Sequence, residues 1–246
     1  MKVKVTDAKS FQDMLKTLGE FVPEVVLDFT KDGLKVKGVD ASKVVLIDIY
    51  LPSGYFDEYE VENEEKVGIN LEDVTELLKS ITKEDSMTLS TENGTLIITL
   101  DGEYTRTFKT PTIQVEEAEI PNLDLEFPFR AKMITPTFVD IISSFEDLGA
   151  DVVKLKSEGG SKLYLTASSD LGDSTVELSL DNGGLLEAEG SDAESTYGLE
   201  YLVNTTRLKR VSGSLEVRFG TQLPLKLRYE MPQGGYNDFY IAPRAE

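Results

Sequence analysis

The chain has 246 residues, and its 25 lysines and arginines against 45 aspartates and glutamates give a formal net charge of −20. Cysteine and histidine are both absent, which excludes disulfides, cysteine nucleophiles and histidine acid–base catalysis, and we expect no metal site and no cofactor. The sequence has no run of about 18 apolar residues and no apolar leader, so we expect a cytoplasmic protein without a membrane anchor. An outer surface with this charge should repel nucleic-acid phosphates.

The first half of the chain is predicted to contain two amphipathic helices among short strands. Residues 7–19 and 71–81 place apolar side chains at intervals of three and four, which is the helical period. Asp-Gly at 32–33 and Asn-Gly at 93–94 lie within alternating segments and indicate β-hairpins. Residues 103–110 also alternate, and we predict an edge strand there.

The middle of the chain is predicted to be a connector. Residues 109–127, KTPTIQVEEAEIPNLDLEF, contain two prolines and several acids and have no helical period. We therefore expect an extended segment that joins two domains, at residues 1–108 and 128–246.

The second half of the chain repeats the pattern of the first. The segment TFVDIISSFEDLGADVVKLK, from residue 137, resembles SFQDMLKTLGEFVPEVVLDF, from residue 10. Helices are predicted at 136–149 and 198–210, with Thr135 and Pro136 as N-cap and first turn of the third helix and Gly149 at its end. Residues 172–181 are predicted as a second edge strand. The pattern indicates two similar α+β domains in tandem.

The predicted fourth helix carries an unusual cluster of positive charge. Arg207, Lys209 and Arg210 lie within four positions and no acid interrupts them. One interpretation is that cations near a helix C-terminus offset the helix macrodipole. The other is that they bind a polyanion.

No arrangement of residues typical of catalysis is present. The glycine pairs at 159–160 and 183–184 lack the spacing of phosphate-binding loops and a following helix, so we interpret them as turns. With so many carboxylates, some pair will lie at glycosidase spacing in any fold, so that pattern carries little weight. A carboxylate-only hydrolase on a duplicated scaffold is the enzyme that is hardest to exclude.

Three segments together resemble a known family. They are KGVDASKVVLIDIYL at 37–51, VEEAEIP at 115–121 and DFYIAPRAE at 238–246. Along its whole length the sequence resembles the DNA sliding clamps of the proliferating cell nuclear antigen (PCNA) family, most of all subunits of crenarchaeal heterotrimeric rings. The resemblance implies the DNA-clamp fold, with tandem duplicated clamp domains, antiparallel sheets outside and four helices facing a central channel. It also implies a trimeric ring around duplex DNA that performs no chemistry.

The resemblance also implies three sets of functional residues. The DNA-facing residues of the channel would be Lys9, Lys16, Lys79, Lys83, Arg207, Lys209 and Arg210. The groove that binds a partner's PIP box would comprise Val39, Val44, Leu46, Ala118, Ile120, Pro121, Pro224, Tyr240, Ile241, Ala242 and Pro243. The subunit interface would contain Arg106, Phe108, Lys109, Val176, Glu177 and Leu178.

The partners implied by the resemblance are double-stranded DNA bound without sequence preference, other clamp subunits, the clamp loader replication factor C, and PIP-box proteins such as DNA polymerase, flap endonuclease and DNA ligase. The protein would be a processivity factor in replication and repair, associated with the nucleoid of an archaeal cell. The third helix departs from many clamps because it has Asp140, Glu146 and Asp147 but no basic residue. This favours a heterotrimer over a homotrimer, and it leaves open an interaction scaffold that does not encircle DNA.

Overall fold

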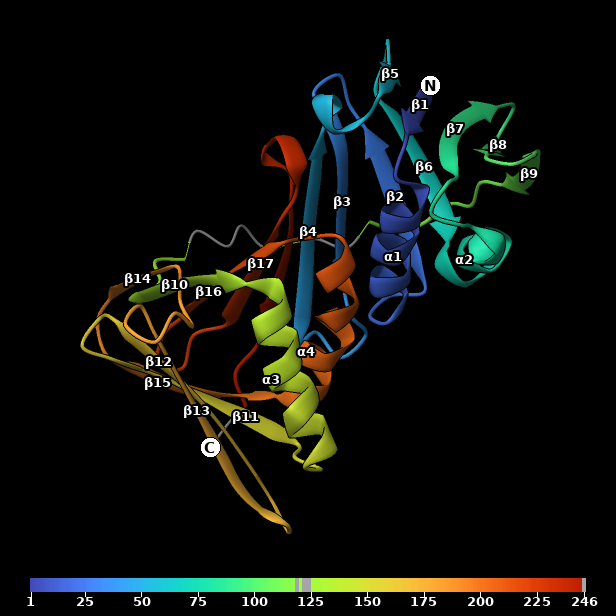
Figure 1. Ribbon diagram of the computed structural model, residues 1–246. Helices are drawn as coiled ribbons and strands as arrows, with labels where there is room; N and C mark the ends of the chain where they lie inside the picture. The colour runs from blue at the N-terminus through green and yellow to red at the C-terminus, as the bar shows by residue number, and fades with distance from the viewer. Residues whose placement is uncertain (118–119, 121–124, 245–246) are drawn as a thin grey trace. The chain divides into compact units, whose positions relative to one another are not determined.

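The structure is a computed structural model that describes residues 1–117, 120 and 125–244 (Figure 1). The chain divides into two compact units. The first consists of Met1–Ala41, Ile47–Ile120 and Met231–Tyr236, and the second of Ser42–Leu46, Pro121–Glu230 and Asn237–Glu246. Because the units follow contacts rather than chain order, the domain boundaries proposed at residues 108 and 128 stay a prediction.

Antiparallel strands of the first unit form two sets. One set has the order β5-β1-β7-β8-β9 and the other β4-β3-β2-β6. Their bounds are β1 (Lys2–Val5), β2 (Glu24–Phe29), β3 (Gly33–Val39), β4 (Val45–Pro52), β5 (Glu58–Glu60), β6 (Glu65–Asn70), β7 (Ser86–Glu92), β8 (Thr95–Asp101) and β9 (Thr105–Pro111). The alternation expected from the sequence places Leu96, Ile98 and Leu100 of β8 in the core.

Two helical segments of the first unit begin at side-chain caps. Helix α1 (Ala8–Gly19) begins after Asp7, whose carboxylate accepts from the Ser10 backbone N–H. Helix α2 (Leu71–Leu77) begins after Asn70 and continues as the 3-10 turn η2 (Leu78–Ser80). The two helices lie side by side, and the buried Gln12 amide donates to the Leu78 carbonyl at 2.6 Å. The expected helix at 71–81 is therefore shorter and ends in a tighter turn.

The second unit repeats this arrangement. Its strands have the orders β14-β10-β16-β17-β18 and β13-β12-β11-β15. Their bounds are β10 (Phe129–Ile134), β11 (Val152–Glu158), β12 (Lys162–Ser169), β13 (Gly172–Ser179), β14 (Glu187–Gly190), β15 (Ala193–Gly198), β16 (Ser214–Phe219), β17 (Leu225–Glu230) and β18 (Tyr236–Ile241). Two short 3-10 turns, η1 (Ser53–Tyr55) and η4 (Pro232–Gly234), both belong to the first unit.

Helix α3 of the second unit corrects one prediction about its ends and confirms the other. Helix α3 (Thr135–Asp147) has Ile134 at its N-cap, so Thr135 is a helical residue and its buried hydroxyl makes no hydrogen bond. The predicted end is confirmed, because Gly149 has a φ of 78° and donates to the Glu146 carbonyl.

The predicted fourth helix is half α-helix and half 3-10 helix. Helix α4 (Leu199–Thr205) gives way to η3 (Thr206–Arg210). At the change, the Thr205 hydroxyl donates to the Leu202 carbonyl at 2.8 Å and the Thr206 hydroxyl to the Val203 carbonyl at 2.7 Å. These bonds to carbonyls three residues earlier compete with the α-helical pattern and favour the tighter turn.

Each unit has its own apolar core between helices and strands. Phe11, Met14 and Phe29 are fully buried in the first unit. In the second, the Tyr229 and Phe239 rings meet edge to face with centroids 6.1 Å apart. The Tyr229 hydroxyl lies 2.7 Å from that of Thr205, and burial raises its pKa. None of the described helices is long and apolar enough to cross a membrane.

Candidate functional site

The basic cluster lies on the turn η3. Arg207, Lys209 and Arg210 are all exposed, whereas Leu208 between them is fully buried. Because a 3-10 helix has three residues per turn, Arg207 and Arg210 lie on one side and Lys209 on another. The buried leucine fixes the turn to the core, so the three cations are held at the surface of the second unit.

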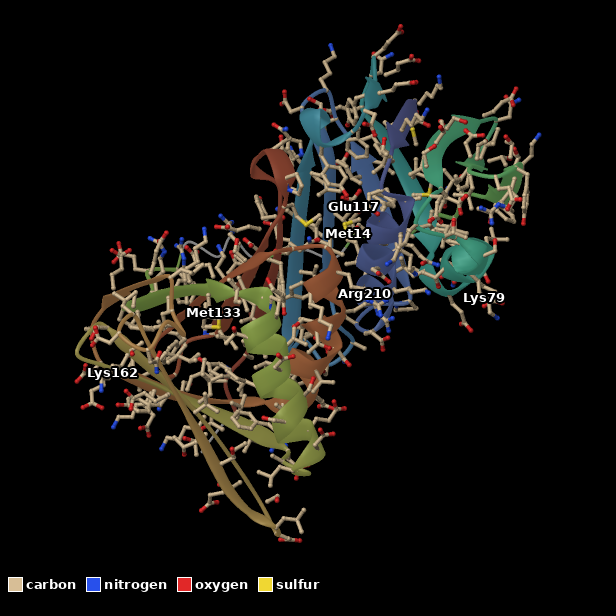
Figure 2. All side chains as sticks on the ribbon, in the orientation of Figure 1. Met14, Lys79, Glu117, Met133, Lys162 and Arg210 are labelled. Atoms are coloured by element: carbon tan, nitrogen blue, oxygen red, sulfur yellow. The ribbon has the colours of Figure 1, made fainter. Side chains whose placement is uncertain are left out.

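The candidate DNA-binding lysines of the first unit differ in burial and in their contacts within the chain. Lys9 is half-buried, and its ammonium lies 2.5 Å from Gln12 Oε1 and 3.7 Å from the buried Asp13 carboxylate. Lys79 is exposed (Figure 2), and its ammonium pairs with Glu76 at 2.9 Å. Lys83 is exposed in the loop after η2, and Lys16 is half-buried on α1. Lys9 and Lys79 therefore each already have an acidic partner within the chain.

The exposed side of α3 is acidic. Asp140, Glu146 and Asp147 are exposed, while Phe138, Ile142 and Phe145 fill the core. The helix has no basic residue. This face alone would repel a phosphate backbone.

Strand β9 lies at one edge of the five-stranded sheet of the first unit, and this edge position was predicted. The Thr112 N–H donates to the Gly94 carbonyl at 2.9 Å, in the register that pairs β8 with β9. Since backbone direction alternates along an antiparallel strand, the N–H groups of Thr105, Thr107 and Lys109 point away from β8. Pro111 has the same orientation and has no N–H to donate. The outer edge of β9 therefore presents three backbone N–H donors, and Pro111 adds none.

Strand β13 is the open edge of one sheet of the second unit, also as predicted. The Ser179 carbonyl accepts from the Leu185 N–H at 3.0 Å, and Asn182 bonds to the Ser179 N–H and the Glu177 carbonyl. These backbone groups consequently point away from β12, as do those of Asp173 and Thr175. The loop that follows covers one end of the edge, so the N–H groups of Asp173, Thr175 and Glu177 remain directed outward.

The predicted interface side chains fall into three groups. Phe108 and Val176 lie on the core faces of the two edge strands but are only half-buried, so a neighbouring strand would complete their cover. Lys109 is exposed. Leu178 is already buried by its own unit, where it pairs with Leu163 of β12.

Two charged interface candidates already have partners within the chain. Arg106 lies 2.5 Å from the buried Asp85 carboxylate, donates to the Ser80 carbonyl at 2.8 Å and stacks on Tyr104. The Thr82 backbone N–H lowers the pKa of Asp85, and Arg106 lowers it further. Glu177 pairs with Lys162 at 3.0 Å. Arg106 therefore already has a buried acidic partner within the chain, so a pair with an acid of another subunit would compete with it.

The connector is attached to the first unit along β6. The Ile113 N–H donates to the Gly68 carbonyl at 2.9 Å, and a Cβ on residue 68 would lie 2.0 Å from the Ile113 oxygen, so only glycine permits this approach. Lys66 pairs with Glu117 at 2.5 Å, a hydrogen bond that raises the lysine pKa. Apart from an isolated glycine in a strand pattern, no local sequence pattern predicts these attachments.

Two of the predicted groove residues line a cavity of the first unit. The cavity measures about 440 Å³ and lies between β2, β3 and the connector. Val39 and Ile120 belong to its wall, together with Val22 and Val26. Ala118 and Pro121 lie outside the described residues.

The remaining groove candidates belong to the second unit. Val44, Leu46, Pro224, Tyr240, Ala242 and Pro243 are all half-buried. The Ala242 N–H donates to the Val44 carbonyl at 2.8 Å, which joins two segments far apart in the sequence. Ile241 is an exception, because its side chain is fully buried and cannot line a groove. The side chains of neighbouring residues on a strand point to opposite faces, so Tyr240 and Ile241 cannot both line the same groove.

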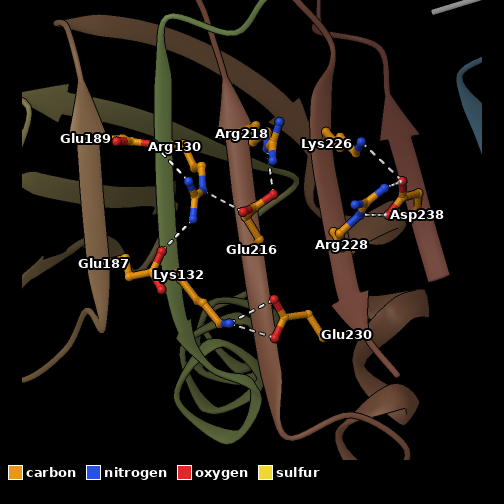
Figure 3. A network of polar contacts seen from close by, with 10 residues as sticks. All are labelled: Arg130, Lys132, Glu187, Glu189, Glu216, Arg218, Lys226, Arg228, Glu230 and Asp238. Atoms are coloured by element: carbon orange, nitrogen blue, oxygen red, sulfur yellow. Dashed lines mark hydrogen bonds and ion pairs between the residues drawn. The ribbon is translucent and has the colours of Figure 1, made fainter. Parts of the chain in front are cut away.

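A network of ten charged residues lies on the strands β14, β10, β16, β17 and β18 of the second unit, on the face opposite the core. Figure 3 shows its members, Arg130, Lys132, Glu187, Glu189, Glu216, Arg218, Lys226, Arg228, Glu230 and Asp238. Buried Glu216 accepts from Arg130 and Arg218, each at 2.6 Å. Burial alone would raise the pKa of Glu216, but the two arginines outweigh it and lower the pKa. Lys132 and Ser214 have the same net effect on Glu230.

These lowered pKa values predict sensitivity to acid. A carboxylate with a lower pKa in the folded than in the unfolded chain stabilises fully above its unfolded pKa and loses that contribution as pH falls through the folded pKa. We expect the free energy of unfolding to decline below about pH 4.5, the ordinary value for glutamate. Glu216→Gln should lower it by about 1–3 kcal/mol at pH 7 and make the decline shallower. Urea titrations from pH 7 to 3 measure the free energy of unfolding of wild type and Glu216→Gln. If the two proteins lose stability equally as pH falls, the lowered pKa of Glu216 does not contribute.

Comparison with known proteins gives a consistent result. Residues 1–126 match the family model described as proliferating cell nuclear antigen, N-terminal domain. The chain is 60% identical to DNA polymerase sliding clamp 3 of Sulfurisphaera tokodaii and 54% identical to sliding clamp 2 of Sulfolobus acidocaldarius, each over 100% of both chains.

Solved structures agree in fold. A chain of the PCNA2-PCNA3 complex from Sulfolobus tokodaii matches with a TM-score of 0.96 at 59% identity, covering 100% of both chains. PCNA from Thermococcus kodakaraensis matches with a TM-score of 0.92 at 27% identity, covering 99% of each. The predicted DNA-clamp fold and the predicted resemblance are confirmed, and the chain belongs to the PCNA family of DNA polymerase sliding clamps.

Proposed function

We propose that this chain is one subunit of a trimeric ring that encircles duplex DNA and tethers replication and repair proteins to it as a processivity factor. The observation that carries the proposal is the pair of open edges, β9 on the first unit and β13 on the second. Open edges favour aggregation unless another chain covers them, and in a ring each of these two edges pairs with an edge of a neighbouring subunit. It is a binding protein and not an enzyme.

The ring contains other clamp subunits in addition to this chain. The similarity to a chain of the PCNA2-PCNA3 complex supports a heterotrimer. The acidic face of α3 supports it too, because other subunits then supply basic residues to the channel. Partner strands pair with the outward N–H groups of Thr107 on β9 and Thr175 on β13. Size-exclusion chromatography with light scattering, on mixtures with candidate subunits, measures the composition.

Duplex DNA is held in the channel by contacts to phosphates. The exposed cluster Arg207, Lys209 and Arg210 supplies positive charge to the channel, together with Lys79, Lys83, Lys16 and Lys9. Such contacts carry no sequence information, so the ring slides. The acidic remainder of the surface confines the attraction to the channel.

Partner proteins bind through PIP boxes, for which the candidate apolar residues include Val39 and Ile120 in the first unit and Pro224 and Tyr240 in the second. Half-buried aliphatic, proline and tyrosine side chains fit the aromatic and aliphatic plugs of such a motif. DNA polymerase, flap endonuclease and DNA ligase are the proteins that we expect to bind there, and replication factor C is the expected loader.

Encirclement is tested by retention on DNA. Rings loaded on a closed circular plasmid should remain through gel filtration and should be lost after linearisation. Changing Arg207, Lys209 and Arg210 together to alanine should shorten retention on the circle several-fold at low salt, because each released counterion contributes to binding. The difference should shrink as salt rises.

The matched control for this triple variant is Lys154→Met, which removes an exposed lysine from β11 that pairs with Glu194. It should retain DNA like wild type. Equal retention by the triple variant at low salt would assign the cluster to the helix end alone. Loss from circular and linear plasmids at the same rate would contradict encirclement and support the scaffold alternative.

A further inference from the structure

The side chain of Asn182 closes one end of the outer edge of β13. Its Oδ1 accepts from the Ser179 backbone N–H at 2.9 Å, and its Nδ2 donates to the Glu177 carbonyl at 3.0 Å. In a larger sheet these two backbone groups would bond to an adjacent strand. The carboxamide has a donor and an acceptor side by side, so it takes the place of that strand's backbone.

The loop after β13 holds the asparagine in this position. Asn182 Oδ1 also accepts from the Gly184 N–H at 2.9 Å, and the Asn182 N–H donates to the Ser179 hydroxyl at 3.2 Å. The loop turns at Gly183, whose φ of 74° is one that glycine adopts without strain. It closes where the Leu185 N–H donates to the Ser179 carbonyl at 3.0 Å.

These bonds limit what β13 can offer to another chain. Both outward backbone groups of Ser179 and the outward carbonyl of Glu177 are already bonded within the loop. The N–H and carbonyl of Asp173 and of Thr175 and the N–H of Glu177 remain for a neighbouring strand. The part of the edge that can pair is therefore shorter than β13 itself.

Side-chain alternation alone would not fix where a neighbouring strand pairs. A slip of one residue turns every side chain to the wrong face, whereas a slip of two keeps the faces and moves only the hydrogen bonds. Towards the end of β13, a slip of two needs the backbone groups of Ser179, which the loop occupies. The carboxamide of Asn182 would have to leave first, so this slip is unfavourable.

The occupant of this edge is the edge strand of another clamp subunit. Four of the five exposed large apolar side chains of the described residues adjoin β9 or β13. Tyr104 precedes β9, Leu171 precedes β13, and Leu180 and Leu186 follow β13. Apolar side chains gathered beside unpaired strands are typical of a surface that a further chain covers.

We propose that Asn182 is a positioning residue of the subunit interface: it ends the open edge of β13 and so sets the register in which a neighbouring clamp subunit pairs with Asp173, Thr175 and Glu177. The inference rests on the proposed ring. In the sequence, an asparagine before two glycines predicts only a turn. The contacts of its side chain with the strand are what show the further role.

Hydrogen exchange at single backbone amides tests the proposal. The chain is measured alone and mixed with the other clamp subunits of the same organism. The four proteins are wild type, Asn182→Ala, Asn182→Asp and the control Asn63→Ala, which changes an exposed asparagine of the first unit. Aspartate keeps an acceptor for the Ser179 N–H and lacks the donor to the Glu177 carbonyl.

In wild type, mixing should slow exchange at Asp173, Thr175 and Glu177 at least about fivefold and leave Ser179 unchanged, since the Ser179 amide is already bonded. In Asn182→Ala the Ser179 amide should exchange at least about fivefold faster in the free chain. Mixing should then slow it, because the neighbouring strand can pair further along β13. The two other variants should behave like wild type at Ser179.

The outcomes separate the role of Asn182 from the ring itself. If no amide of β13 slows in wild-type mixtures, the proposed pairing at this edge fails, and the inference fails with it. If the three amides slow but the Ser179 amide of Asn182→Ala exchanges like wild type, alone or in the mixture, only the role of Asn182 is overturned. Asn182 is exposed, so the substitutions should not unfold the chain. A melting curve checks this, and Asn182→Gln, whose longer side chain cannot hold the same two bonds, replaces the alanine variant if that variant does not fold.

Discussion

Replacing Thr107 by proline is expected to prevent ring assembly while the chain itself stays folded. The Thr107 N–H points away from β8, so proline removes no hydrogen bond of the chain's own sheet. It does remove a donor to the neighbouring subunit, which costs about 1 kcal/mol. The proline ring also blocks the approach of the facing strand. Together these effects should weaken association more than about tenfold.

Thr107→Val is the matched control, since it keeps the N–H and a β-branched side chain, and it should assemble like wild type. Thr175→Pro should act like Thr107→Pro, at the edge of the other unit. Light scattering of mixed subunits measures assembly, and circular dichroism checks the fold. Proline at Leu178 is unsuitable, because that backbone N–H faces β12 and the change would damage the sheet itself. Assembly of folded Thr107→Pro at wild-type affinity would contradict the assignment of β9 as an interface.

The positions of helices and edges followed from the sequence because period and alternation decide them. Phe11, Met14 and Leu15 predicted the buried side of α1, and alternation over 103–110 and 172–181 predicted both edge strands. The end of the fourth helix could not be predicted from the sequence. Thr206 looks like an ordinary helical residue, and only its bond to the Val203 carbonyl shows the 3-10 turn.

The candidate sites could be predicted as residue types but not as contacts. Arg106 was expected to be available to another subunit, but the buried Asp85 holds it. That pairing connects residues 21 positions apart through the fold, which no local pattern reveals. Ile241 was placed in the groove with Tyr240 by family position, although alternation along β18 puts it in the core. Applying the two-residue period would have excluded it.

Removing the Tyr240 side chain is expected to weaken partner binding severely. A PIP-box peptide should bind the free wild-type subunit at about micromolar affinity, the balance of two buried plugs against ordering and association costs. An aromatic side chain at the centre of such a groove contributes about 2 kcal/mol or more, so Tyr240→Ala should bind about thirtyfold more weakly. The Tyr240 side chain is only half-buried in the free chain, so the substitution should not unfold the chain.

Ile120→Ser tests the cavity of the first unit in the same way. The side chain lines the 440 Å³ cavity beside Val39, and serine removes most of the apolar surface that the side chain offers there. Binding should fall about tenfold, the consequence of losing roughly 1.5 kcal/mol of apolar contact. Leu171→Ala is the matched control: it deletes the most exposed of the large apolar side chains described, 82% exposed at the β12–β13 turn, far in sequence from any groove residue. Its affinity should equal wild type, since general surface hydrophobicity does not bind the motif. If Tyr240→Ala and Ile120→Ser remain folded and also bind like wild type, the partner site lies elsewhere on this chain.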